Sequence, residues 1–239
     1  MDETVSIDPR FCGPPEIGNG GYVAGLLARR IAGPATVSLR APAPLAEPLA
    51  VRREAAGRLG LYRGDTLLAS AEPARVSIEA PPAPDARETL RRAGSCRAFQ
   101  THPFPGCFVC GPKRAPGDGL RIFPGPVPGT DRVAAPWVPA PEFGDEAGHV
   151  RTEFVWAALD SPSSFPLLED EASRRLEPMV LGKLAVDIAG PVVAGEPHSV
   201  VAWPLSLEGR RGVAGVALYR ESGDAVALGR ATWVSLAGR

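Results

Sequence analysis

Hydrophobic and polar residues alternate in many short runs along the chain, and glycine and proline separate these runs. Residues 61–78 are predicted to form a strand, a Gly-Asp turn and a second strand, which is the pattern of a β-hairpin. Residues 218–236 repeat this pattern with the same Leu-Tyr-Arg start. Upstream of each hairpin, two further apolar runs flank a turn rich in proline and glycine, at residues 37–55 and 184–205. Two similar pieces in the same order predict an internal duplication.

A helical pattern precedes the strands in each half. In residues 20–31, Val23, Leu27 and Ile31 recur at intervals of four, and the adjoining face carries only glycine and alanine. Such a helix can lie very close to a sheet. Residues 150–159 also place apolar side chains on one side, and the Asp-Ser-Pro that follows interrupts or ends the helix. The pattern predicts one helix and then about four antiparallel strands, twice.

Residues 80–119, between the two halves, are rich in proline, glycine and arginine. A short helix is predicted within this segment at Asp85–Ala93. The boundary between the halves therefore falls near residues 80–95, and the segment that contains the cysteine pair introduces the second half.

Charge excludes several classes of partner. The 239 residues include 26 Lys and Arg against 27 Asp and Glu, so the chain has no strong field to attract nucleic acid or an anionic membrane surface. Its longest apolar runs fall short of the roughly 20 residues of a membrane span. The first residues are acidic where a signal peptide is basic. We expect a cytoplasmic protein that binds neither nucleic acid nor membranes.

Three segments resemble acyl-CoA thioesterases of the hotdog superfamily. Gly18–Leu27 resembles the start of their central helix, and Val155–Asp160 resembles the second central helix of the double-hotdog members. Cys107–Pro112, followed by Gly119–Ile122, resembles a segment that opens many thioesterase-like hotdog domains. The resemblance implies an α+β fold, a tandem (double) hotdog, in which each half is a central helix wrapped by a curved antiparallel sheet.

The resemblance also implies where the two repeats lie and how they associate. We expect an N-terminal hotdog at residues 1–85, a Pro/Gly-rich connector with the C-x-x-C at residues 86–118, and a C-terminal hotdog at residues 119–239. Hotdog sheets usually pair edge to edge, so the halves are expected to share one sheet with their helices packed together. A homodimer is expected on the same basis.

The activity that the resemblance implies is hydrolysis of an acyl-CoA thioester to the free acid and CoA, in a cleft between the two repeats. This reaction needs a base that activates water and donors for the oxyanion. Asp160 is the predicted base, and the free N–H groups at the start of the first helix are the predicted donors. The catalytic candidates are Asp160, Asn19, Gly20 and Gly21, and the candidates for substrate binding are Tyr22, Trp156, Ser161 and Ser164.

Ordinary structural roles explain some of these residues equally well. Asn19 can be an N-cap, and Asp160 can form a cap or turn before Ser161 and Pro162. Long-chain double-hotdog thioesterases combine their aspartate with a hydroxyl residue and a glutamine, but the last strand here, residues 229–234, has no glutamine. Two alternatives therefore stay open: a non-catalytic acyl-CoA or lipid-binding hotdog protein, and a hotdog dehydratase or hydratase.

A cysteine and histidine cluster is a candidate zinc site. Cys96, His102, Cys107 and Cys110 have the spacing C-x5-H-x4-C-x2-C. One C-x2-C pair is a weak signal, and reduced cysteines in a tight turn account for it more simply. We expect no metal ion and no other cofactor, and the identity of the acyl chain is not decided by the sequence.

Overall fold

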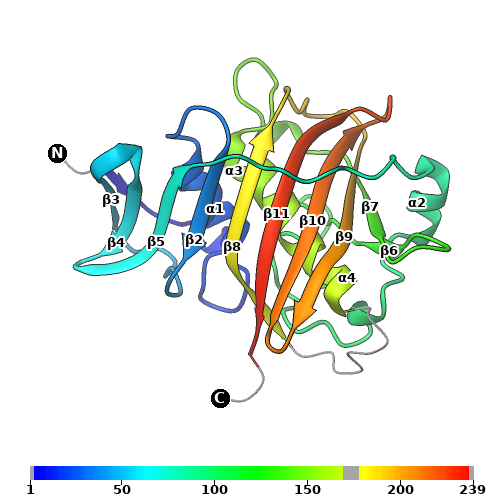
Figure 1. The fold of residues 1–239 in the computed structure, drawn as a ribbon, viewed down its shortest axis with the longest axis horizontal. Helices are drawn as coiled ribbons and strands as arrows, with labels where there is room; N and C mark the ends of the chain where they lie inside the picture. Colours follow the sequence, from blue (N-terminus) through cyan, green and yellow to red (C-terminus); the bar gives the residue numbers. More distant parts are fainter. Residues whose placement is uncertain (1–2, 169–177, 237–239) are drawn as a thin grey trace.

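One antiparallel sheet of eleven strands dominates the computed structural model, which describes residues 3–168 and 178–236 (Figure 1). The two longer helices, α1 and α3, lie together on one face of this sheet. The helices are α1 (Gly20–Ala28), α2 (Ala86–Arg92), α3 (Thr152–Asp160) and α4 (Phe165–Leu168). The strands are β1 (Glu3–Val5), β2 (Ala35–Leu39), β3 (Leu49–Arg53), β4 (Leu59–Arg63), β5 (Thr66–Pro73), β6 (Gly125–Pro126), β7 (Val133–Trp137), β8 (Met179–Ile188), β9 (His198–Glu208), β10 (Arg211–Arg220) and β11 (Ala225–Ser235).

The order of strands across the sheet is β1-β3-β4-β5-β2-β8-β11-β10-β9-β7-β6. β2 and β8, the first strand of each half to follow its long helix, lie in the middle and pair from Ala35 with Val186 to Ser38 with Lys183. Outward from this pair, each half places its fourth, third and second strands in the same order. The predicted succession of one helix and four strands, twice, and the predicted continuous sheet are both confirmed.

Local signals in the sequence set the predicted turns and caps. The Gly64-Asp65 turn joins β4 to β5, and a turn at residues 221–224 joins β10 to β11, so both predicted hairpins are present. The predicted short helix in the connector is α2, and its N-cap Asp85 accepts a hydrogen bond from the Glu88 N–H at 2.8 Å.

The face of α1 that carries only glycine and alanine packs against α3. Its composition had suggested close packing against the sheet instead. A Cβ atom added at Gly21 would lie 2.4 Å from Cβ of Asp160, and one added at Gly25 would lie 2.4 Å from Cα of Glu153. Real Cβ atoms do not approach other atoms so closely, so only glycine at these positions allows the two helices to approach this closely. The predicted helix at residues 20–31 is shorter than expected and ends at Ala28.

The apolar core has two parts, one on each face of the sheet. The larger part lies between the sheet and the helices. The smaller part lies on the opposite face, where Trp203 and Tyr219 are covered by residues 74–85. We call this segment the strap, because it crosses the outer face of the sheet on its way from β5 to α2 (Figure 1). Among the described residues, no helix has the length and apolar character required to span a bilayer.

Candidate active site

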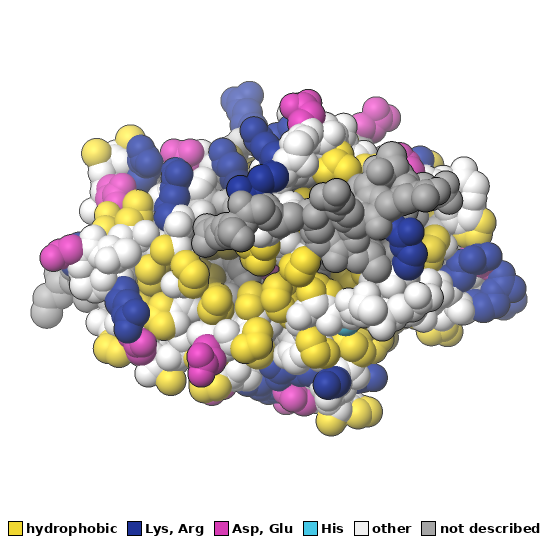
Figure 2. All heavy atoms as spheres, turned by 90° about the horizontal axis from the view of Figure 1, so that it is seen from below, with side chains coloured by type: hydrophobic (Ala, Val, Ile, Leu, Met, Phe, Trp, Pro, Cys, Tyr) yellow, Lys and Arg dark blue, Asp and Glu magenta, His cyan; other side chains and the backbone are white. Residues whose placement is uncertain are grey.

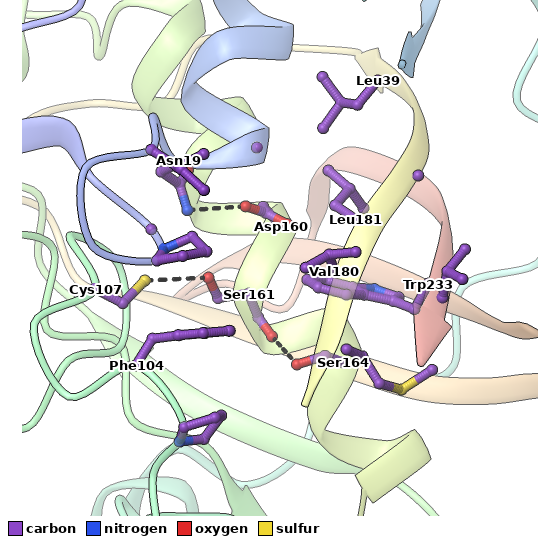
Figure 3. Close-up of a pocket in the computed structure, with 18 of the residues that line it drawn as sticks. Asn19, Leu39, Phe104, Cys107, Asp160, Ser161, Ser164, Val180, Leu181 and Trp233 are labelled. Carbon is purple, nitrogen blue, oxygen red and sulfur yellow. Dashed lines mark hydrogen bonds between the residues drawn. The ribbon is translucent and has the colours of Figure 1, made fainter. Parts of the chain in front are cut away.

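A cavity of about 480 Å³ lies between the start of α1, the segment after α3, and the adjacent ends of β8 and β11 (Figure 3). Its walls are largely apolar and include Leu39, Leu181 and Trp233. Figure 2 views the molecule from the side on which these strand ends lie, and hydrophobic side chains gather across the middle of that surface. The polar side chains in the cavity lining are few: Arg40 at an exposed position, and Asn19, His102, Cys107, Cys110, Asp160, Ser161 and Ser164.

Asp160 is the buried carboxylate of this cavity. Its Oδ2 atom accepts hydrogen bonds from Nδ2 of Asn19 at 2.9 Å and from the Gly21 N–H at 2.8 Å. Its Oδ1 atom is buried and has no hydrogen-bond partner among the described residues. Burial raises the pKa of Asp160 to about 7 and the charge on Cys107 adds to the increase, while the two hydrogen bonds oppose it.

The start of α1 places one backbone donor in the cavity. Asn19 is the N-cap, and its Oδ1 atom accepts from the Tyr22 N–H at 2.9 Å. The Gly21 N–H binds Asp160, so the N–H groups of Gly21 and Tyr22 are both engaged within the protein. The N–H of Gly20 has no acceptor among the described residues, and Gly20 lines the cavity. Gly20 is therefore the donor that a ligand can use.

Comparison with known proteins identifies the fold. No protein-family model matches the sequence, and no curated protein matches it. A protein of unknown function with a hot dog fold from Alicyclobacillus acidocaldarius matches with a TM-score of 0.62 at 13% identity, over 99% of this chain and 93% of that one. The chain has the hotdog fold. Two further structures match at similar levels: the tesB protein of Mycobacterium avium subs paratuberculosis (TM-score 0.60, 14% identity, 92% of this chain and 87% of that one) and acyl-CoA thioesterase II TesB2 of Mycobacterium marinum (0.58, 16%, 91% and 88%).

The hotdog fold brings most of the predicted site together. Asn19, Gly20, Asp160, Ser161 and Ser164 all line the cavity, and Ser161 and Ser164 lie on the 3₁₀ turn Ser161–Ser164 that continues from α3. The N–H of Gly21 reaches the same carboxylate from the neighbouring hotdog helix.

Two predicted substrate-binding residues do not line this cavity. The ring of Tyr22 stacks on Phe11 with 4.3 Å between ring centroids, inside a cluster of aromatic side chains. Trp156 is fully buried on α3, beside Gly25 of the other hotdog helix. Both side chains belong to the packing that holds the helices together.

The cysteine pair, for which the sequence favoured a tight turn over a zinc site, lines the cavity beside Asp160. The N–H of Gly111 donates to the carbonyl of Cys107 at 2.9 Å and closes the turn, and a Cβ atom at Gly111 would lie 2.5 Å from that oxygen. Sγ of Cys107 lies 3.7 Å from Oγ of Ser161, the neighbour of Asp160. The C-x-x-C-G sequence was a usable signal for this turn, but nothing in it indicated contact with residue 161.

The candidate zinc ligands are not arranged as a metal site. Within residues 3–168 and 178–236, no group of three or more His, Cys, Asp and Glu side chains is arranged to hold a metal ion. His102 lines the cavity, where its Nδ1 atom accepts from the Phe104 N–H at 3.1 Å and burial lowers its pKa. It is thus a neutral imidazole at neutral pH.

Proposed function

We propose that this chain is a tandem of two hotdog repeats, residues 1–85 and 119–239 joined by the connector 86–118, and that it hydrolyses an acyl-CoA thioester to a free acid and coenzyme A. The single observation that carries this proposal is the orphaned Oδ1 atom of Asp160, which is buried in a largely apolar cavity beside the free N–H of Gly20. The fold similarity to structures described as acyl-CoA thioesterases supports the same reaction.

Asp160 is the general base in the proposed reaction. In its ionised form it accepts a proton from a water molecule, whose oxygen attacks the carbonyl carbon of the thioester. The pKa of about 7 suits this role, because the group holds a proton weakly enough to be ionised at neutral pH and strongly enough to remove one from water. The proton then passes to the sulfur of coenzyme A when the carbon–sulfur bond breaks.

The start of α1 stabilises the oxyanion in this mechanism. Gly20 is the first residue of α1, so a hydrogen bond from its N–H and the positive end of the helix dipole both favour negative charge on the carbonyl oxygen. Asn19 holds Asp160 through its side-chain amide and also closes the first turn of the helix. One residue therefore couples the position of the base to the position of the donor.

The acyl chain is assigned to the apolar walls formed by Leu39, Leu181 and Trp233. An apolar cavity with a few convergent polar groups is the usual form of a site for such a ligand. The Trp233 indole is held in place because its Nε1–H donates to Oγ of Ser163 at 2.9 Å. Arg40, at an exposed position in the lining, is the charged group best suited to the phosphates of coenzyme A.

The test is release of coenzyme A, measured with Ellman's reagent across acetyl- to palmitoyl-CoA and aromatic acyl-CoAs. Asp160→Asn keeps the size of the side chain but removes the base, so kcat is expected to fall by a factor on the order of 10² to 10⁴. Asp187→Asn is the matched control, because Asp187 lies on β8 and does not line the cavity.

Two results would contradict the proposal. Full activity of Asp160→Asn would remove Asp160 from the mechanism. Saturable thermal stabilisation by an acyl-CoA, with no release from any substrate in the panel, would instead identify a hotdog protein that only binds acyl-CoA.

A further inference from the structure

We propose that Cys107 and Cys110 are a redox-active dithiol in the wall of the cavity, which a low-molecular-weight disulfide oxidises to an intramolecular disulfide. Both side chains are buried, and both line the cavity, so a small reagent reaches them from within it. Both are thiols in this structure. The turn closed by Gly111 holds the two cysteines on one wall.

The surroundings of Cys107 favour its thiolate form. The groups that can stabilise negative charge on its sulfur are the thiol of Cys110, the backbone N–H groups of Val109 and Cys110, and the hydroxyl of Ser161, whose Oγ lies 3.7 Å away. These donors lower the pKa of Cys107 to about 6, against the effect of burial. The same pairing, together with burial, raises the pKa of Cys110. An attacking cysteine with a low pKa beside a second cysteine with a high pKa is the arrangement of a reactive C-x-x-C pair.

The chemical step balances without any other group. The Cys107 thiolate attacks one sulfur of the small disulfide, and the first small thiol leaves as its thiolate. Cys110 then attacks the Cys107 sulfur of the mixed disulfide, loses its proton and releases the second small thiol. Starting from the Cys107 thiolate and the Cys110 thiol, the protein loses two electrons and one proton. The small disulfide becomes one thiolate and one thiol, and the thiolate takes up a proton from water.

Oxidation of Cys107 and Cys110 would change the electrostatic surroundings of Asp160, the base of the proposed hydrolysis. The negative charge on Cys107 raises the pKa of Asp160. Ser161 links the two groups, because it follows Asp160 in the sequence and its Oγ atom lies 3.7 Å from Sγ of Cys107. A disulfide carries no charge, so its formation removes this effect. The inference about the dithiol nevertheless does not depend on the hydrolysis, because the disulfide is detected by mass whether or not a substrate is known.

The experiment uses the full chain, reduced, desalted and treated with glutathione disulfide, then acid-quenched for intact-mass analysis and peptide mapping. The wild type is expected to lose the mass of two hydrogen atoms, with the new bond mapped between Cys107 and Cys110. Cys110→Ser is expected to stop at a glutathione adduct on Cys107. Cys12→Ser is the matched control, since Cys12 is more exposed but lies outside the cavity lining, and it should behave as the wild type.

A second measurement, on the wild type, guards against a variant that fails to fold. Alkylation of Cys107 by iodoacetamide should reach half its maximal rate near pH 6, whereas an ordinary thiol does so near pH 8.5. Disulfide formation mapped to Cys12 or Cys96 instead, or adducts at Cys12 while Cys107 stays reduced, would overturn the proposal. If the protein hydrolyses an acyl-CoA but its dithiol stays reduced, this inference alone is wrong. If the dithiol is oxidised but no substrate is hydrolysed, the proposed function alone is wrong.

Discussion

At the scale of single residues, the chemistry of the site depends on side chains whose pKa values are shifted by their surroundings. Asp160 has two donors on one oxygen and none among the described residues on the other, so its buried charge is only half compensated. Partial compensation explains why its pKa is raised although two hydrogen bonds stabilise the ionised form. A fully satisfied carboxylate would be a poor base.

The pH dependence of activity follows from this pKa. If ionised Asp160 is the base, kcat/KM rises with pH up to about 7 and falls by roughly tenfold per unit below that value. The measurement is the pH profile of coenzyme A release at low substrate concentration. A rate that is constant between about pH 5 and pH 8 would exclude Asp160 as the group that titrates.

The same group makes a testable contribution to stability. Its pKa is about 4 in the unfolded chain and about 7 in the folded protein, so between these values the folded protein binds more protons than the unfolded chain. The contribution of Asp160 to the free energy of unfolding is therefore fully present below about pH 4 and is lost, by up to about 1.4 kcal/mol per pH unit, as the pH rises toward 7.

Asp160→Asn should remove this dependence. Relative to the wild type, the variant should gain stability as the pH rises from about 4 to about 7, measured by urea unfolding at several pH values. Titrating groups that do not interact with residue 160 contribute equally to both proteins, so the difference between the two reports Asp160 together with Cys107, whose charge is coupled to it. A difference that stays constant over this range would contradict the raised pKa.

At the scale of elements, the crossing of α1 and α3 determines whether the site exists. The two helices meet where Gly21 and Gly25 have no side chain, and this contact brings the Asp160 carboxylate to the Gly21 N–H. The proposed base and the start of the proposed donor helix are thus parts of one helix–helix contact. Packing that separates the helices would separate the proposed catalytic groups as well.

Gly25→Ala tests this contact. Alanine favours a helix by about 1 kcal/mol over glycine, but its Cβ atom would lie 2.4 Å from Cα of Glu153, a backbone atom that cannot rotate away. The variant is expected to lose about 1 to 3 kcal/mol of stability in urea unfolding, together with activity. Gly106→Ala is the control, since a Cβ atom there meets nothing within 4 Å, and equal stability of the two variants would contradict the tight crossing.

At the scale of the whole molecule, the strap joins the halves on the face opposite the helices. The hydroxyl of Tyr219 on β10 donates to the carbonyl of Pro81, and Ile78, Ala80 and Ala83 pack over the outer apolar cluster. The strap therefore starts at β5 of the first half and packs on strands of the second. It covers apolar side chains that the sheet would otherwise expose to water.

Tyr219→Phe should loosen the strap without disturbing the cavity. Loss of this hydrogen bond should cost about 0.5 to 1.5 kcal/mol in thermal unfolding, and proteolytic cleavage within residues 74–85 should be faster. Tyr62→Phe is the control, because it removes a Tyr hydroxyl bond to Glu54, which is not a residue of the strap. Unchanged cleavage of Tyr219→Phe would mean that apolar packing alone holds the segment.

The sequence predicted the elements well because their signals are local. Gly64-Asp65, the Asp85 cap and the Asn19 cap each act over a few residues, and a single sequence displays them directly. The contacts between distant segments were less accessible. The glycines of α1 signalled a close approach but not its partner, and the burial of Tyr22 and Trp156 among other aromatic rings depends on how the helices cross.

The pairing of Arg29 with Glu153 has a consequence for stoichiometry. These side chains lie 3.3 Å apart where the end of α1 meets the start of α3, the position related to the Asn19 and Asp160 site by exchanging the two helices. In the proposed tandem, an ion pair thus fills the place of a second, equivalent centre. In a dimer of identical subunits, both centres would have the same residues. In one fused chain, one end of the helix pair can carry the proposed catalytic residues while the other end carries an ion pair that holds the helices together. An acyl ligand titrated into this protein should saturate at one molecule per polypeptide.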